Sequence, residues 1–491
     1  MVEPIVPIVI VGAGPHALSL VLTLLEEDSA GEFTEAESTM LSYWRKKQLA
    51  PHRVNLRDCI RVIDPSGCWC ANWNANFELF GISHLRSPLG VHLDPLRPEG
   101  LRDFATSAGR SREVTPPPAT IPFNKKNRAF ASNTSMFSEN DRQFFGCPSQ
   151  ALFATFNDQL VHQYGVAGLV EKEQAGFIEP IFTEGDKKHP SSYRVHCASG
   201  RVFQASKVVV AVGTQRLPRR PQWSLTCRAT YHSTDLVAQG LATVAARYAK
   251  TRPHVLIVGG GLTSVHLAKQ ALRWGARYVT LLTRSQHFRV QPYDVPLEWL
   301  SPTLRDKMRA EFFAERDPLG RLNKIKAARG RGSVTQAALD ELMAATTPHN
   351  YTHRGGVQIV AVNDIDGHLH VQLDVAETII VDEVILATGA DIDIARDPLF
   401  KAILPLGMTV TGGFPNVDDE LRVAPGINVF VMGAYGALRL GPTAGNLMGG
   451  RAGANLLAEV LLEELLPPVV KTAHHHMRCL CGKENMFDLL R

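Results

Sequence analysis

The stretch IVIVGAGPHA (Ile8–Ala17) joins a β-branched run to a glycine-rich turn, and the apolar segment LSLVLTLLEE follows it directly. This is the pattern G-x-G-x-x-A between a strand and a helix. Gly12 permits the tight turn, Gly14 lets the backbone approach a pyrophosphate, and Ala17 keeps the helix close to the strand. The first turn of the helix then offers N–H groups to the anion. The stretch therefore predicts a dinucleotide-binding unit at the start of the chain.

Runs of this kind recur along the chain, and each is a short apolar strand that ends in glycine. Because the runs are apolar on both faces of the pleat, they are typical of buried parallel strands with helices on each side. The five runs are IVIVGAG (Ile8–Gly14), VVVAVG (Val208–Gly213), VLIVGGG (Val255–Gly261), VILATG (Val384–Gly389) and VFVMG (Val429–Gly433). The sequence therefore predicts an α/β fold built on parallel sheets.

A second turn of the same type, GGGLTS (Gly259–Ser264), opens the segment VHLAKQALRW, and a helix there is expected to end at Gly275. The next strand, Tyr278–Leu282, is followed by Thr283-Arg284. A guanidinium at this position suits a 2′-phosphate, whereas an acid would repel it. Arg284 therefore favours NADPH over NADH, and the alternative is a solvated charge at a strand end.

The acid that binds the ribose is expected at the end of a strand about 20 residues after the first turn, and no strand-like run ends in an acid there. The next good strand end is IRVID (Ile60–Asp64). We interpret Asp64 as this acid and residues 28–58 as an insertion. The alternative is that Asp64 only caps the strand before Pro65-Ser66-Gly67.

The composition excludes several classes of protein. Among 491 residues, 52 Lys and Arg against 48 Asp and Glu give a net charge of +4, so no nucleic-acid or acidic-membrane partner is implied. Hydrophobic residues make up 45% and charged residues 20%, which excludes a disordered chain. The apolar runs are too short for a membrane helix. Met1–Ile10 has no secretory signal pattern, and eight cysteines fit a reducing compartment, so we expect a cytoplasmic protein.

The spacing of the cysteines argues against disulfide reductase chemistry, and one cluster near the C-terminus raises the question of a metal site. No Cys-x-x-Cys or Cys-x-x-x-x-Cys pair exists, so a flavin disulfide reductase would lack its redox pair. His474, His475 and His476 with Cys479 and Cys481 are able to bind a metal, but a polar tail after Pro467-Pro468 is the simpler interpretation. We therefore expect no metal.

Two dinucleotide units, the second inside the first, resemble the two-dinucleotide-binding flavoproteins over residues 5–465. Within these, the chain looks like the class B and N-hydroxylating flavin monooxygenases. VFVMGAYG with Leu440–Asn446 is similar to the C-terminal flavin segment, and Gly67 and Trp69 match the loop after the ribose acid. HLRSP (His84–Pro88) resembles amine N-hydroxylase-like flavoproteins. Of the monooxygenase fingerprint F-x-G-x-x-x-H-x-x-x-[FY], only His232-Ser233 is present.

The resemblance implies two Rossmann-like three-layer domains, with an NADP(H) domain inserted in an FAD domain. The implied FAD domain comprises residues 1–215 and 392–468, and the NADP(H) domain comprises residues 216–391 with a helical insertion at 291–350. Residues 469–491 form a C-terminal tail. The implied FAD-binding residues are Gly12, Gly14, Pro15, His16, Ala17, Asp64, Trp69, Gly213, Gly433, Gly445 and Asn446. The implied NADPH-binding residues are Gly259, Gly261, Thr263, Ser264, Arg284 and Gly389.

The resemblance further implies an FAD- and NADPH-dependent monooxygenase. It would use O₂ to oxygenate a small-molecule nucleophile, an amine nitrogen, a sulfur or a ketone, through a flavin C4a-hydroperoxide. The resemblance does not decide whether the protein is a monomer or a homo-oligomer. Two alternatives remain: an FAD-binding regulatory protein of the oxidative-stress-induced growth inhibitor type, and an NADPH-dependent flavin reductase or dehydrogenase without oxygen transfer.

Arg86 and Asn446 are the candidate catalytic residues. Arg86, with His84, is expected to line the flavin face, and the alternative is a surface ion pair. Asn446 is expected to reach the flavin or its oxygen adduct, and the alternative is simple helix capping. Gln291 is a weaker candidate on the nicotinamide side.

Local signals predict several further elements. Helices are expected over Ser149–Tyr164, with Ser149 as N-cap, and over Asn446–Leu466. The insertion is expected to hold helices at 302–314 and 334–345, with charged turns between them. A hairpin is expected around Asp366-Gly367. Residues 110–146 are a long loop, either a lid or a surface excursion.

Overall fold

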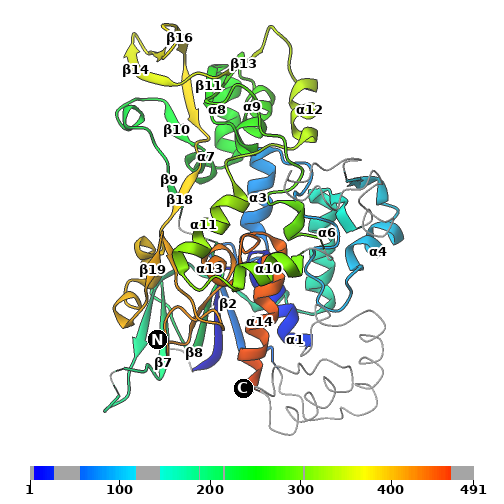
Figure 1. Ribbon diagram of the computed structural model, residues 1–491, viewed down its shortest axis with the longest axis vertical. Coiled ribbons are helices and arrows are strands. Elements are labelled where there is room, and N and C mark those ends of the chain that lie inside the picture. Colours follow the sequence, from blue (N-terminus) through cyan, green and yellow to red (C-terminus); the bar gives the residue numbers. More distant parts are fainter. Residues whose placement is uncertain are drawn as a thin grey trace.

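The computed structural model describes residues 5–26, 56–117, 144–186, 188–213, 216–301 and 305–465. Two large sheets, each flanked by helices, follow one another along the long axis of the molecule (Figure 1). The first sheet lies in the lower part of the figure and the second in the upper part. The predicted α/β fold with two nucleotide-binding-type units is therefore confirmed.

The first sheet has the strand order β5-β2-β1-β8-β7-β6, and β21 also pairs with β8. β1, β2, β5, β8 and β21 run parallel, whereas β6 and β7 are antiparallel to their neighbours. The strands are β1 (Val6–Val11), β2 (Ile60–Asp64), β5 (Val170–Lys172), β6 (Ala175–Ile181), β7 (Ser192–Cys197), β8 (Val202–Val210) and β21 (Val429–Val431). The late strand β21 thus returns to the first sheet, as the resemblance to the two-dinucleotide-binding flavoproteins implies.

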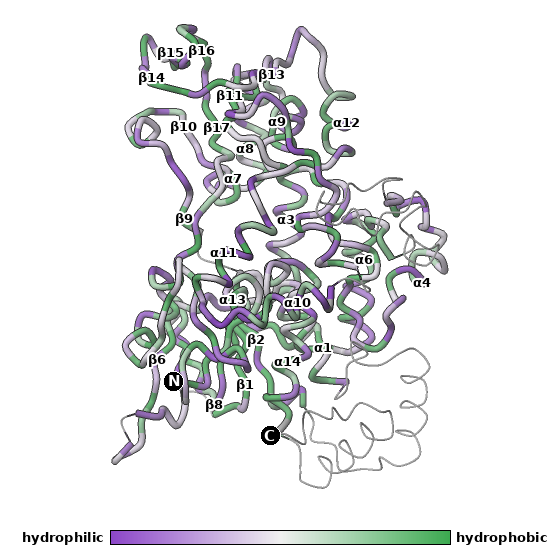
Figure 2. Tube along the Cα trace, viewed as in Figure 1, coloured by the Kyte–Doolittle hydropathy of each residue, from purple (hydrophilic) through white to green (hydrophobic). Residues whose placement is uncertain are grey.

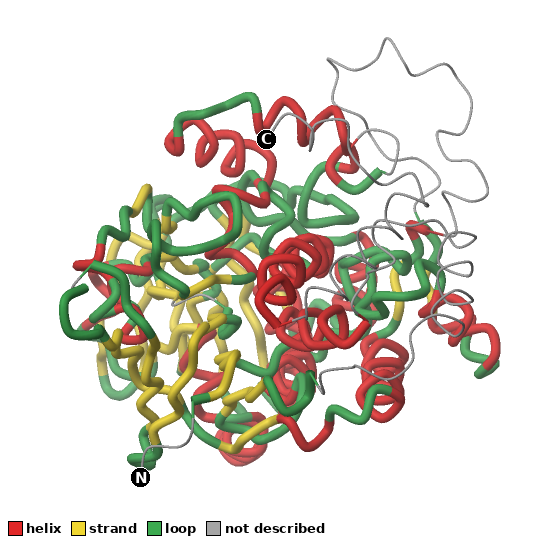
Figure 3. The backbone as a smooth tube through the Cα atoms, turned by 90° about the horizontal axis from the view of Figure 1, so that it is seen from below, coloured by secondary structure: helices red, strands yellow, loops and turns green. Residues whose placement is uncertain are grey.

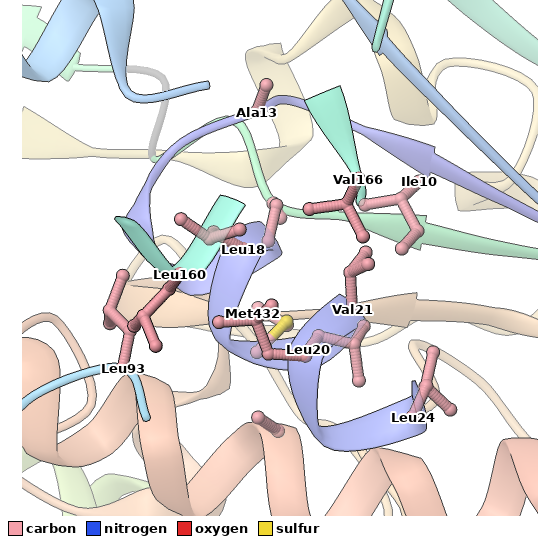
Figure 4. Packing of buried hydrophobic residues seen from close by; sticks show 14 of the residues in the cluster. Ile10, Ala13, Leu18, Leu20, Val21, Leu24, Leu93, Leu160, Val166 and Met432 are labelled. Atoms are coloured by element: carbon pink, nitrogen blue, oxygen red, sulfur yellow. The ribbon is translucent and has the colours of Figure 1, made fainter. Parts of the chain in front are cut away.

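Alternate residues of β1 enter two different cores, which explains why the strand is apolar on both faces. Ile8 and Ile10 pack with α1 (Pro15–Glu26) and α14 (Leu447–Leu465), while Val9 and Val11 pack on the other face with short 3-10 segments. α1 lies between the sheet and α14, so it has little polar surface (Figure 4). In Figure 2 the chain near the labels β1 and β2 is largely green, the colour of hydrophobic residues. In Figure 3 the yellow strands lie together, with red helices packed beside them.

The second sheet is wholly parallel, with the order β10-β17-β11-β12-β13. Its strands are β10 (Thr230–His232), β11 (His254–Val258), β12 (Tyr278–Thr283), β13 (Tyr351–Gly355) and β17 (Glu383–Leu386). Its helices are α7 (Ser233–Gln239), α8 (Leu241–Thr251), α9 (Leu262–Trp274) and α12 (Gln336–Ala344). Gly275 ends α9 with φ +109°, as predicted.

A short antiparallel ladder joins the two units. It pairs β9 (Arg216–Pro218) with β18 (Ala390–Ile392) and forms a narrow connection in Figure 1. Beside it, Arg219 Nε donates to Asp391 Oδ1 at 2.8 Å. The boundaries that the sequence predicts, 215/216 and 391/392, fall on this ladder, and we propose it as the domain connection.

The predicted helical insertion is divided between the two units. α10 (Arg305–Phe313) and α12 confirm the two expected helices, but α11 (Pro318–Arg329) lies where only charged turns were expected. The N-cap of α11, Asp317, accepts hydrogen bonds from the N–H groups of Leu319 and Gly320. α12 packs on α9. The α10 and α11 side chains instead join a core with residues of the flavin side, and this core includes Tyr293, Trp299, Phe312, Leu322, Phe145 and Leu438.

The other local predictions that fall on described residues are confirmed. α6 (Gln150–Gln163) begins after Ser149, whose hydroxyl accepts the N–H of Leu152 at 3.0 Å. The hairpin joins β14 (Ile359–Ile365) to β15 (His368–Leu373), with positive φ at both turn residues, and β16 (Thr378–Val381) extends it. α4 (Gly100–Ser107) packs on α6, whereas α3 (Ala71–Phe80) contacts α6 and also α8 and α9 of the second unit. Most of the segments 28–58 and 110–146, and all of the tail 469–491, lie outside the described residues.

No helix in the described ranges is long and apolar enough to cross a membrane. In the same ranges, no three His, Cys, Asp or Glu side chains are grouped so that they could hold a metal. The His474–Cys481 candidate falls outside the described ranges, and the expectation of no metal there stays a prediction.

Three histidines make the stability of the fold depend on pH. Burial lowers the pKa of His16, His92 and His266 to about 4 each, so they stay neutral in the fold while the unfolded chain takes up protons below its ordinary pKa. Stability is therefore expected to fall from pH 6.5 towards pH 4, by up to about 1.4 kcal/mol per pH unit for each histidine. Urea unfolding between pH 8 and pH 5 measures this slope.

His266→Gln is expected to reduce the slope, because the ring of His266 is buried with Nδ1 unbonded. His162→Gln is the matched control on an exposed histidine. An unchanged slope in His266→Gln would contradict the assignment.

Candidate active site

The first glycine-rich turn holds two glycines for different reasons. Gly12 has φ +102°, and a Cβ there would lie 2.8 Å from the carbonyl oxygen of Ala211 at the end of β8. A Cβ on Gly14 would meet nothing within 4 Å. Strand packing therefore requires Gly12, whereas Gly14 leaves open space at the N-terminus of α1. Such a space beside helix N–H groups fits a pyrophosphate.

Asp64 lies next to this turn because β2 pairs in parallel with β1. Its Oδ2 accepts the N–H of Ala13 at 3.0 Å, and its Oδ1 accepts the N–H and the hydroxyl of Ser66 at 2.9 and 2.5 Å. Asp64 thus orders the turn and the loop after its own strand. A carboxylate has about four acceptor positions, so capacity for a ribose hydroxyl remains. The indole N–H of Trp69 donates to the carbonyl of Val166 at 3.0 Å, which fixes the loop.

His16 lies in a cradle of glycines. A Cβ on Gly433 would lie 3.0 Å from its Nδ1, and a Cβ on Gly450 would lie 2.5 Å from its Cδ2. The ring also hydrogen-bonds to the backbone of Asn446. His16 therefore joins the first turn, the turn after β21 and the start of α14. Gly433 is buried, whereas Gly213 and Gly445 are exposed.

Asn446 caps α14. Its Oδ1 accepts the N–H groups of Met448 and Gly449 at 3.0 and 3.2 Å, and its Nδ2 donates to Asp294 Oδ1 at 3.3 Å. The capping alternative thus describes its side chain in this structure, and its catalytic role stays a prediction.

Arg86 is half-buried between the two units, where its recorded partners are backbone carbonyls and a hydroxyl and not the surface ion pair considered as its alternative. Its Nη2 donates to the carbonyls of Gln291 and Tyr293 and to the hydroxyl of Ser333, each at 2.8 Å. Burial lowers its pKa to about 10. His84 is half-exposed and contacts only its neighbour Ser83 by a side-chain bond, Nδ1 to Oγ at 3.1 Å. Arg86 therefore fixes the 291–293 backbone against the flavin-side loop.

Gln291 has a buried Oε1 with no hydrogen-bond partner among the described residues. Its backbone N–H donates to the carbonyl of Val334, so the chain position is held. A buried acceptor without a donor is costly, and such atoms often face a ligand. The weaker candidate from the sequence is thus placed beside Arg86.

Close packing against β17 and a hydrogen bond within the turn fix the conformation of the second glycine-rich turn. A Cβ on Gly259 would lie 2.4 Å from the carbonyl oxygen of Ala387, and the Ser264 hydroxyl donates to the carbonyl of Gly261 at 2.7 Å. Ser264 is thus used within the turn, whereas Thr263 is exposed. Gly389 accepts from Arg219 N–H at 3.0 Å and bonds to the ring of His232, so it lies at the connection between the units.

Arg284 is exposed at the carboxyl end of β12. The preceding residue, Thr283, lies beside the turn, because its Cγ2 would be 3.7 Å from a Cβ on Gly260. Arg284 thus directly follows a residue that lies beside the second turn, and its contact with the 2′-phosphate stays a prediction.

Residues of the insertion connect the two turns, and no motif in the sequence points to them. Gly332 packs against Gly261, and its neighbour Ser333 bonds to Arg86. Arg329 donates to the carbonyl of Pro442 at 2.8 Å and pairs with Asp294 at 3.2 Å. A continuous path of contacts therefore runs from the second turn through Arg86 and Asp294 to the start of α14 and the first turn.

Comparisons with known proteins agree with this geometry. A family model described as pyridine nucleotide-disulphide oxidoreductase matches residues 118–311. No curated protein matches the chain in sequence.

Solved structures match nearly the whole chain. An ornithine N-hydroxylase from Kutzneria sp. 744, described with reduced FAD, NADP⁺ and L-ornithine, has a TM-score of 0.65 at 15% identity, covering 94% of this chain and 100% of that one. Ornithine hydroxylase (PvdA) from Pseudomonas aeruginosa has 0.63 at 16%, covering 94% and 100%. L-lysine 6-monooxygenase from Pseudomonas syringae has 0.61 at 15%, covering 93% and 99%. The chain therefore has the two-unit dinucleotide-binding fold of these N-hydroxylating flavin monooxygenases, as the resemblance in its sequence implied.

Proposed function

We propose that the protein is an FAD- and NADPH-dependent monooxygenase that uses O₂ to oxygenate a small-molecule nucleophile, with an amine nitrogen as the first class to test. The observation that carries the proposal is the path of contacts between the two glycine-rich turns. Hydride transfer requires the nicotinamide to meet the flavin, and this path links the two turns through the contacts of Arg86 and Asp294. The amine class is supported by the shared fold with ornithine and lysine hydroxylases.

The residues at each turn fit a dinucleotide. FAD would be held by the α1 N-terminus at Gly14, by Asp64 and by the start of α14, and NADPH by the Gly259–Ser264 turn and Arg284. When bound, the two cofactors supply hydride transfer and the reaction with O₂. The chain lacks the Cys-x-x-x-x-Cys pair that a disulfide reductase needs, which favours oxygenation over that chemistry.

The protein's own groups prepare the junction. Arg86 places a positive charge in a half-buried position, and three hydrogen bonds orient it. A fixed charge in a site with little water acts more strongly than in solution. Gln291 Oε1 offers an acceptor to an N–H group of a bound carboxamide or amine.

Purified protein mixed with NADPH, with and without O₂, tests the proposal. We expect bound FAD, loss of its visible absorbance on addition of NADPH, and NADPH consumption that rises with formation of a hydroxylated amine. Amines of graded length, such as ornithine, lysine and cadaverine, separate productive from unproductive turnover.

Three other outcomes of this experiment would argue against the proposed monooxygenase. FAD that NADPH cannot reduce would favour the regulatory flavoprotein. Reduction followed only by peroxide release, for every nucleophile offered, would favour the reductase. Protein that binds no FAD would exclude all three interpretations.

A further inference from the structure

An arginine-rich cavity lies along the side of α14, apart from both glycine-rich turns. Its volume is about 560 Å³, and it lies between α10, α13 (Ala437–Leu440) and one stripe of α14. α10, α13 and α14 lie together near the middle of the molecule in Figure 1. No residue of either turn lines the cavity.

The cavity wall is strongly positive. Four guanidinium groups line it, and Glu459 is the only carboxylate among its described lining residues. Arg439 also pairs with Asp419 at 3.0 Å from outside the lining, so the balance is four minus two, or +2. The four are Arg305 and Arg309 from α10, Arg439 from α13 and Arg451 from α14. Like charges that share a cavity repel one another, and an anion between them would reverse this cost.

Arg451 gives a second, independent indication. In the described part of the chain, no hydrogen bond or ion pair is recorded for its guanidinium. Burial lowers its pKa, Arg305 lowers it further, and the nearby Asp94 raises it. Asp94 already accepts hydrogen bonds from the side chain of Arg97 at 3.1 Å and from two backbone N–H groups. A half-buried cation whose neighbouring acid, Asp94, is already engaged by other donors favours a further anion in the cavity.

Apolar and aromatic side chains make up most of the remaining wall, and Thr443 and Asn455 add two uncharged polar groups. The large apolar members are Val91, Phe144, Trp299, Phe313, Leu440, Met448 and Leu456. The volume lies within the range of small-molecule sites, about 300–1,000 Å³. We propose that this cavity binds an amphiphilic anion, a carboxylate with an aliphatic or aromatic body, at a site that contains no residue of either glycine-rich turn. This proposal does not depend on the proposed monooxygenase activity.

Calorimetric titration of the full-length protein with octanoate tests the site. We expect octanoate to bind once per chain, acetate to bind far more weakly because it cannot use the apolar wall, and octylamine not to bind. Arg451→Met keeps the length of the side chain and removes the charge, and we expect it to weaken octanoate binding at least about tenfold.

Arg309→Met is a second variant, at an exposed position of the same wall, and is expected to weaken binding without disturbing the fold. Arg316→Met is the matched control, since Arg316 is exposed nearby and does not line the cavity. The proposal fails if octanoate does not bind, if octylamine binds as well as octanoate, or if both cavity variants bind octanoate as the wild type does.

Discussion

Gly14→Val is expected to abolish retention of FAD while the fold remains intact. A side chain at this position meets no protein atom, because a Cβ there has nothing within 4 Å. It would instead fill the open space at the N-terminus of α1, where the pyrophosphate is expected to approach the backbone. We expect the FAD dissociation constant to rise at least about 100-fold, or about 2.7 kcal/mol. Fluorescence titration of the apoprotein with FAD measures the constant.

Gly12→Ala is the matched variant, only two residues away, and should behave differently. Its Cβ would lie 2.8 Å from the carbonyl oxygen of Ala211, on a backbone with φ +102°. We expect a loss of about 1–3 kcal/mol in the free energy of unfolding of the apoprotein, along with weaker FAD binding. Normal FAD binding by Gly14→Val would show that the pyrophosphate lies elsewhere, and a destabilised apoprotein in that variant would show that the space is not open.

Arg284→Glu is expected to reverse the preference for NADPH. The arginine is exposed at the end of β12, beside the second turn, so its replacement should leave the sheet unchanged. The substitution removes charge-assisted hydrogen bonds to the 2′-phosphate and adds repulsion. We expect kcat/KM for NADPH to fall about 100-fold, which corresponds to about 2.7 kcal/mol, while the value for NADH is kept. The rate of flavin reduction by each nucleotide gives this ratio directly.

Arg273→Glu is the control for the change in net charge. Arg273 is exposed in the last turn of α9, at the end of that helix away from the turn. We expect this variant to keep the coenzyme preference of the wild type. If Arg284→Glu lowered the rates with NADPH and NADH equally, Arg284 would not be the residue that distinguishes them.

Contacts close in the chain explain what could be predicted. The strand–turn–helix at Ile8–Ala17, the Ser149 cap and the Asp366-Gly367 hairpin each depend on residues within a few positions of one another. α11 was missed although its Asp317-Pro318 start was readable, because its many charged residues hid the apolar positions Leu322 and Ile325. Those positions pack on a core that belongs to the other unit.

The sequence by itself determined the two glycine-rich turns and the buried strands that lead into them. It also predicted that the second unit is inserted within the first. Only the tertiary structure decided which residues link the two turns. Arg86 lies 205 positions from Gln291 and 247 from Ser333, and Asn446 lies 152 from Asp294. A local pattern records which faces of an element are apolar, and this fixes strands and helices. It carries no information on which distant polar groups will satisfy one another once those faces are buried, so the junction and the arginine-lined cavity appear only when the elements pack.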